Sequence, residues 1–227
     1  MSIEKSSLSN ERETGRLEAF SDGVIAVAIT LLILDIHVPP FDPKLPLLQA
    51  LINDRTAYLG YVTSFLIIGL FWANHHYMFK YIKKTDHLLL LLNTLTLMCL
   101  VFLPFATALL VEHFSDSYQT TAAVMYNSSL LLTSIMYNVL WGYVRRHPAL
   151  LVEGLPADLL SKMTRRYLVS IPLYALTLII SALYVEVSLV LYLLIALLYA
   201  LPANRFPLGK RRRVLVENVS KERPIEG

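Results

Sequence analysis

The chain has 227 residues, of which 56% are hydrophobic and 16% are charged, and its formal net charge is +3. Soluble domains carry about 25% charged residues, so this composition excludes an ordinary soluble domain. Together with a mean hydropathy of +0.54, it indicates a membrane protein. A single cysteine, Cys99, leaves no disulfide framework and no zinc spacing within the chain.

Six stretches approach the roughly 20 apolar residues that a helix needs to cross a bilayer. They lie at 17–37, 57–80, 87–111, 120–143, 165–185 and 187–205. The sequence therefore predicts an all-α, polytopic membrane protein with six transmembrane helices in a domain at 16–206. A polar N-terminal segment at 1–15 lacks the pattern of a secretory signal, and a basic tail follows at 207–227.

The first span opens on Arg16, Ser21 and Asp22, which places two charged side chains at the mouth of a membrane helix. Charges at that depth cost several kcal/mol when they face lipid, so protein partners or a polar passage must satisfy them. Asp22 is therefore a candidate functional residue. At the other end, Asp35 and His37 either mark where the helix leaves the bilayer, which we favour, or form an acidic rim that concentrates cations.

One side of the first span presents residues spaced by three and four positions, which are Phe20, Gly23, Val27, Thr30, Leu31 and Leu34. Thr30 brings the one hydroxyl of this stripe. The rest of the helix is apolar as well, so periodicity alone does not choose a functional face. A helix packed against lipid is the simpler interpretation of the stripe.

The second span carries Trp72, His75 and His76 near its expected cytoplasmic end, and the third span holds Asn93 among apolar residues. These groups lie in the same half of the bundle as the polar start of the first span. We therefore expect them to satisfy Arg16, Ser21 and Asp22 as a hydrogen-bonded staple between helices. Because His75 and His76 point about 100° apart on a helix, a metal site is not expected.

Two prolines predict local irregularities in the later spans. Pro104 in the third span and Pro172 in the fifth each remove one backbone hydrogen bond, which predicts kinks. Residues 156–163 predict a short amphipathic helix before the fifth span, because Pro156 suits a first helical turn. The turn between the fifth and sixth spans is expected at 185–188.

Positive charges gather in the loops on one side of the six spans, whereas the other side has only Lys44 and Arg55. The charged group comprises Lys80, Lys83, Lys84, Arg145, Arg146, Lys162, Arg165, Arg166 and Lys210–Arg213. By the positive-inside rule both termini are expected to be cytoplasmic. The run Lys210–Arg213 is interpreted as a topology determinant that touches anionic lipid, and nucleic-acid binding is not expected.

The string Arg16-Leu17-Glu18-Ala19-Phe20-Ser21-Asp22-Gly23, followed by an apolar helix ending in Leu-Leu-Ile-Leu-Asp at 31–35, resembles the signature of the transmembrane protein 175 family of potassium channels. Residues 71–76, Phe-Trp-Ala-Asn-His-His, look like the W-x-x-H motif of that family's second helix. One copy of the signature indicates the single-repeat form of bacteria and archaea. A second Phe-Ser-Asp at 114–116 lacks the arginine and falls in a predicted outer loop, so it is a chance match.

The resemblance implies a homotetramer in which the first helices line a central pore for potassium. It places a hydrophobic constriction at Val27, where relatives commonly have isoleucine or leucine, and further lining residues at Thr30, Leu31 and Leu34. The family lacks the T-V-G-Y-G filter of other potassium channels, and this chain has no such string. A prokaryotic cell membrane, membrane lipid and permeant monovalent cations are the implied surroundings, with no cofactor.

Two further functions stay open. A proton-coupled secondary transporter, or a proton pathway, would use the cluster of Asp22, His75 and His76, and broken helices or inverted repeats would favour it. A membrane enzyme with Asp22 and His75 as an acid–base pair would also need a nucleophile or a metal, for which no motif provides the spacing. An enzyme is therefore not expected.

Overall fold

The computed structural model describes residues 2–200, with side chains described for 14–192, 194 and 195. Its elements are α1 (Ser2–Leu31), η1 (Leu32–Asp35), α2 (Leu47–Asn53), α3 (Arg55–Phe79), α4 (His87–Val101), α5 (Leu103–Glu112), α6 (Gln119–Arg146), η2 (Pro148–Leu150), α7 (Ala157–Ser181) and α8 (Val185–Ala200). Within this range the chain is all-helical apart from loops and one isolated β-bridge between Ile82 and Leu151. The basic run at 210–213 and the end of the sixth predicted span lie outside the described residues.

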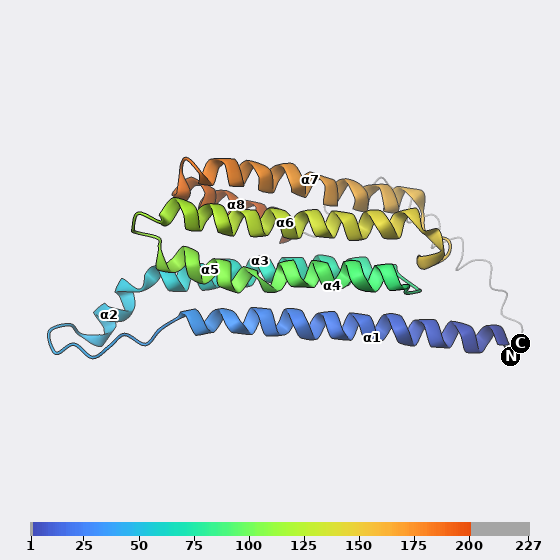
Figure 1. Ribbon diagram of the computed structural model, residues 1–227, viewed down its shortest axis with the longest axis horizontal. Coiled ribbons are helices and arrows are strands. Elements are labelled where there is room, and N and C mark those ends of the chain that lie inside the picture. The colour runs from blue at the N-terminus through green and yellow to red at the C-terminus, as the bar shows by residue number, and fades with distance from the viewer. Residues whose placement is uncertain (1, 201–227) are drawn as a thin grey trace, which may run out of the picture.

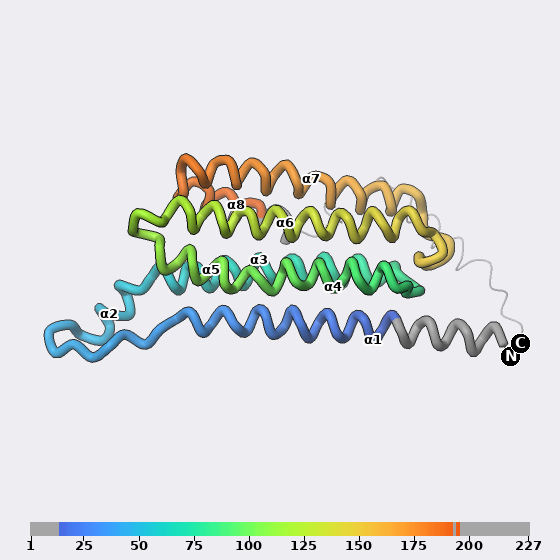
Figure 2. Tube along the Cα trace, in the orientation of Figure 1, coloured from blue at the N-terminus to red at the C-terminus, as the bar shows by residue number. Residues whose placement is uncertain are grey.

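The long helices lie side by side in an elongated bundle (Figure 1). α1 forms one edge of this view, α3, α4 and α5 occupy the middle, and α6, α7 and α8 form the opposite edge. The connection from α1 to α3 extends past one end of the bundle and carries the short helix α2, which the sequence did not predict (Figure 2). α1 is continuous across the expected boundary between residues 15 and 16.

Three of the described segments are long and apolar enough to cross a membrane, and they correspond to the first three predicted spans. They are Thr14–Asp35, Arg55–Phe79 and His87–Glu112, with mean hydropathies of 2.0, 1.5 and 2.3. The fourth predicted span lies within α6, whose middle carries buried polar side chains. For example, the hydroxyl groups of Ser134 in α6 and Ser170 in α7 share a hydrogen bond of 2.6 Å. Such bonds between helices are usual in membrane bundles.

Pro104 marks a break between two helices. α4 ends at Val101 and α5 begins at Leu103, with Pro104 in its first turn, where the missing N–H group has no helical acceptor to lose. Pro172, by contrast, lies inside the unbroken helix α7. The helix predicted at 156–163 is confirmed from Ala157 onward, with Pro156 directly before it, and it continues without a break as the first turns of α7. The turn before α8 lies at 182–184, earlier than expected, because Val185 already starts that helix.

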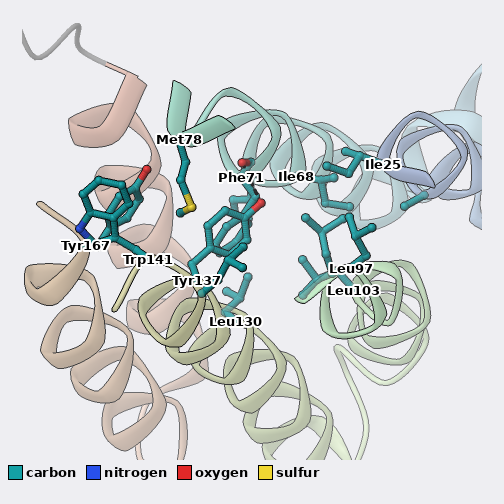
Figure 3. Close-up of a cluster of buried hydrophobic side chains, with 14 of the residues drawn as sticks. Ile25, Ile68, Phe71, Met78, Leu97, Leu103, Leu130, Tyr137, Trp141 and Tyr167 are labelled. Carbon is teal, nitrogen blue, oxygen red and sulfur yellow. Dashed lines mark hydrogen bonds between the residues drawn. The ribbon is translucent and has the colours of Figure 1, made fainter. Parts of the chain in front are cut away.

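Aromatic side chains from α3, α6 and α7 fill the centre of the bundle (Figure 3). The rings of Phe71 and Tyr137 lie 5.3 Å apart, and the Tyr137 hydroxyl donates a hydrogen bond of 2.9 Å to the carbonyl oxygen of Phe71. Trp141 donates its ring N–H to the Thr164 hydroxyl at 2.9 Å. The polar tips of Tyr137 and Trp141 therefore both have partners, which fixes α6 against α3 and α7.

Gly60 is the point of close approach between α3 and α5. A Cβ atom at this position would overlap with Cγ2 of Val111, so only glycine lets the two helices pack at this separation. We expect Gly60→Ala to lower the free energy of unfolding in detergent by about 1 kcal/mol, the low end of the cost of overpacking. Adding Val111→Ala should restore most of the loss. A single variant as stable as the wild type in thermal unfolding would contradict this packing.

Candidate functional site

The two faces of α1 differ in what covers them. One face carries Leu17, Ser21, Ile25, Ala28 and Leu32, all of which are buried. They pack where α1 meets α3 and α4, the neighbours that lie beside it in Figure 1. This buried face repeats every three to four residues, as expected for one side of a helix. From Gly23 onward α1 is apolar on every side, so the sequence did not show which side this would be.

The predicted pore-lining residues lie on the opposite face of α1 and of η1, which continues it. Val27, Leu31 and Leu34 are 57%, 40% and 67% exposed in the single chain, and Thr30 is exposed with them. The Thr30 hydroxyl donates to the carbonyl oxygen of Val27 at 2.9 Å. Since the hydrogen is used inside the helix, the lone pairs of the Thr30 oxygen remain available outside it.

A buried chain of hydrogen bonds joins α3, α4 and α1. His75 bonds through Nε2 to the Asn93 carboxamide oxygen at 2.8 Å, and Asn93 donates through Nδ2 to the Ser21 hydroxyl at 2.9 Å. Ser21 in turn donates to the carbonyl oxygen of Leu17 at 2.8 Å. Because an amide oxygen only accepts, His75 carries its hydrogen on Nε2, and the chain runs in one direction. His75, Asn93 and Ser21 are fully buried. Of the larger staple expected from the sequence, these three residues form one continuous chain, and we call them the staple from here on.

Aromatic neighbours hold the His75 ring in place. It stacks on Phe79 with ring centroids 4.2 Å apart and an interplanar angle of 17°, and it meets Tyr137 edge-on at 6.2 Å. Its Nδ1 atom is buried and has no hydrogen-bond partner among the described residues. The imidazole is therefore set in an apolar environment and presents a single N–H group to Asn93, which suits a structural role.

A second, more exposed seam joins α1 and α3. Trp72 donates its ring N–H to the Asp22 carboxylate at 2.8 Å, and Nδ1 of His76 lies 2.9 Å from the Glu18 carboxylate. The rings of Trp72 and His76 are stacked 5.9 Å apart. Glu18 and Asp22 on α1 thus face two residues of α3 that are also four positions apart. The seam shows one partner that the sequence analysis missed, Glu18, although this matched spacing was available as a signal.

The other two predicted site residues stand apart from these contacts. Arg16 is exposed and makes no hydrogen bond or ion pair within the part of the chain that the structure describes. Phe20 is 57% exposed on the same side of α1 as Val27. The structure therefore brings together Ser21, His75 and Asn93. Separately, it pairs Asp22 with Trp72 of α3, and His76 with Glu18 of α1.

The site offers no assembled set of metal ligands in the described range. No group of three or more histidine, cysteine, aspartate and glutamate side chains gathers there. His75 points into the staple, whereas His76 lies at the seam with Glu18. The cluster that a proton pathway would use is thus divided between a buried and a partly exposed environment.

The loop between α5 and α6 contains an ion pair outside the helices. Nδ1 of His113 lies 2.7 Å from an Asp116 oxygen, and the other Asp116 oxygen accepts the backbone N–H of Tyr118 at 2.7 Å. The hydrogen bond with Asp116 raises the pKa of His113, and the bonds from His113 and Tyr118 lower the pKa of Asp116. Asp116 belongs to the second Phe-Ser-Asp string, where it orders a turn.

This pair gives a pH prediction. His113 adds its full stabilisation below the ordinary histidine pKa of about 6.5, and the contribution is lost as the pH rises through the raised pKa. Asp116 contributes at pH values above its ordinary range and loses that contribution as the pH falls through its lowered pKa. An NMR titration of the His113 ring should therefore show a raised pKa that returns toward about 6.5 in Asp116→Asn. The same pKa in both proteins would contradict the pair.

Long apolar helices, held together by buried polar bonds between neighbouring helices, define an integral membrane protein of the all-α class. A family profile described as "Endosomal/lysosomal potassium channel TMEM175" matches residues 16–104. A potassium channel of Chamaesiphon minutus is 36% identical over 196 residues, which cover 86% of this chain and 97% of that relative. The chain therefore belongs to the TMEM175 family, a family of ion channels, and the resemblance drawn from its sequence motifs is confirmed.

Solved structures agree with this assignment. The crystal structure of a lysosomal potassium-selective channel TMEM175 homolog from Chamaesiphon minutus matches with a TM-score of 0.76 at 35% identity, covering 86% of this chain and 100% of that chain. Among animal relatives, the endosomal/lysosomal proton channel TMEM175 of Gallus gallus is 39% identical over 145 residues. This match covers 59% of the present chain and 28% of that relative.

Proposed function

We propose that this chain forms a homotetrameric, potassium-permeable channel in a prokaryotic cell membrane. The observation that carries the proposal is the exposed stripe of α1, with Val27, Thr30, Leu31 and Leu34 opposite the face that packs on α3 and α4. One stripe on one helix encloses nothing. Four copies around an axis would enclose a narrow passage with apolar rings and one ring of hydroxyl groups.

The chemistry of the stripe fits such a passage. Apolar rings gate by excluding water, and oxygen atoms replace part of the hydration shell of a cation. The free lone pairs of Thr30 would supply those oxygens, and the side chains of Leu31 and Leu34 would form the apolar throat. The potassium channel of Chamaesiphon minutus, similar over nearly its whole length, supports potassium as the permeant ion.

The proposed topology has six crossings with both termini in the cytoplasm. α3, the α4–α5 pair, α6, α7 and α8 would follow α1 as successive crossings, in agreement with their side-by-side arrangement in Figure 1. Lys83, Arg145, Arg146 and Arg165 would then face the cytoplasm, as the positive-inside rule requires.

Flux through reconstituted protein tests the proposal. Purified protein in liposomes with an outward potassium gradient should pass potassium without valinomycin, and cross-linking or mass measurement should give a tetramer. Empty liposomes and a heat-denatured sample are the controls. A verified tetramer that passes no monovalent cation would refute the channel, and a monomer that conducts would refute the shared pore.

Proton permeation is a second candidate, favoured by the name of the animal relatives and by the contact of His76 with Glu18 at the partly exposed seam. A pH-sensitive dye inside liposomes, with potassium absent, separates the two functions. Proton flux that falls in His76→Gln while potassium flux persists would assign a separate proton pathway to the seam. Saturation with an organic substrate would instead indicate a proton-coupled transporter.

A further inference from the structure

Two adjoining grooves lie between the C-terminal end of α6 and the N-terminal half of α7, away from the proposed pore face. Their volumes are about 720 and 730 Å³. Arg145, Arg146, Thr164 and Leu168 line both of them, so the grooves meet at these four residues. The first groove also borders Arg165.

The rim of the grooves carries positive charge that the protein does not neutralise. Arg145, Arg146 and Arg165 are exposed and form no ion pair or hydrogen bond within the described residues. Nearby lysines differ, since Lys162 pairs with Asp158 at 2.6 Å and Lys83 with Glu153 at 3.5 Å. Three unpaired guanidinium groups provide many N–H donors in the planar geometry that matches a phosphate group.

Away from this rim the grooves are apolar. Leu168, Val169 and Pro172 line the first, and Leu92, Val139 and Ile171 are among the residues that line the second. Pro172 lies seven positions after Arg165, which is about 10 Å along a helix. A cationic end with an apolar extension suits an amphiphile, whereas a small free anion would leave the apolar part uncovered.

In the proposed topology the three arginines place the rim at the cytoplasmic end of the bundle. Thr164, which lines both grooves, accepts the ring N–H of the buried Trp141 and is thereby fixed against α6. Basic pockets between helices on the cytoplasmic side bind the headgroups of anionic lipids. The arginine rim and the apolar part of the grooves thus adjoin each other where α6 and α7 meet.

We propose that these grooves bind one diacyl anionic phospholipid, with its phosphate at Arg145, Arg146 and Arg165 and one acyl chain in each groove. This site is independent of the proposed pore, because α1 lines neither groove. The lipid would bridge α6 and α7, and its second chain would also contact α4 through Leu88 and Leu92.

Native mass spectrometry tests the charge requirement. The detergent-purified protein, titrated with phosphatidylglycerol, should retain that lipid in preference to phosphatidylcholine. The triple variant Arg145→Gln, Arg146→Gln, Arg165→Gln should bind phosphatidylglycerol on the order of 100-fold more weakly. Lys162→Gln is the matched control, because Lys162 lies on α7 like Arg165 but lines neither groove. This variant should change phosphatidylglycerol binding by no more than about twofold. If the triple variant and Lys162→Gln lose phosphatidylglycerol binding to the same extent, the proposed site is refuted.

A second variant tests the grooves themselves. Leu168 is 55% exposed and lines both grooves, so Leu168→Trp can fill them without removing a charge or disturbing the core. We expect it to weaken phosphatidylglycerol binding at least tenfold with an unchanged elution volume. Unchanged binding would mean that diffuse charge attracts the lipid, which refutes the grooves. Displacement of the lipid by millimolar inorganic phosphate would likewise refute a lipid site in favour of a free-anion site.

Discussion

Replacing Leu31 by alanine is expected to raise the potassium flux of the reconstituted protein about fivefold and to reduce its preference for potassium over sodium. In the proposed tetramer each substitution removes an isobutyl group from an apolar ring around the axis. A wider and less apolar ring is easier to wet, which lowers the barrier to a hydrated ion. A change of about 1 kcal/mol in that barrier corresponds to a fivefold change in rate.

Ile33→Ala is the matched control for this experiment. Ile33 is 49% exposed, against 40% for Leu31, but it lies in η1, two residues after Leu31 at the end of α1, and therefore on a different side of the helical axis. Its truncation should leave flux and selectivity unchanged if the stripe faces the axis. Stopped-flow fluorescence of liposomes that contain a potassium-sensitive dye gives the potassium flux, and a sodium-sensitive dye in a parallel sample gives the sodium flux. Equal effects of the two variants, or no effect of Leu31→Ala, would contradict the assignment of the stripe to the pore.

The helices could be located from the sequence because apolar runs have a length set by the bilayer. The predicted spans at 57–80 and 87–111 agree closely with α3 and with the pair α4 and α5. The sequence did not predict whether a proline ends a helix or lies inside one, because that depends on the local backbone geometry. Pro104 separates two helices while Pro172 stays inside one, and the local sequence does not distinguish these outcomes.

The staple shows which part of the site the sequence could predict. Ser21, His75 and Asn93 were grouped because polar side chains at a similar depth in a membrane need one another. Their order, with Asn93 between the other two, depends on how each helix is rotated about its axis. Helices that are apolar all round carry no periodic signal of that rotation. The contact between Glu18 and His76 was missed although the four-residue spacing shared by the two helices was available in the sequence.

The staple and the stripe are two consequences of one rotation of α1. Ser21 lies on the buried face, and the hydrogen bond that it accepts from Asn93 fixes that face against α4. Val27 and Leu34 are then held on the opposite side. The polar motif thus orients the helix, and the residues that we assign to the pore lie at other positions along it.

Asn93→Leu is accordingly expected to lower the free energy of unfolding by about 1–2 kcal/mol, with a fall in the melting temperature in detergent. Leucine is close to asparagine in size, so the cost comes from the polar groups left behind. The N–H group of His75 and the oxygen of Ser21 would both lose their partner in a fully buried place. Measured polar bonds between membrane helices average below 1 kcal/mol each, and two of them are lost here.

Thr94→Val controls for the removal of a polar group from the same helix. Thr94 is exposed and its hydroxyl donates only to the Leu90 carbonyl of its own helix, so this variant should melt within about 1 °C of the wild type, given the small effect of most surface substitutions. A cycle with Ser21→Ala isolates the bond between α1 and α4, and a coupling above about 0.5 kcal/mol is expected for residues in one network. If Asn93→Leu is no less stable than Thr94→Val, the two bonds of Asn93 do not hold α1 in place. If it is less stable and its potassium flux also changes, the staple both fastens the helix and sets the face that α1 turns toward the axis.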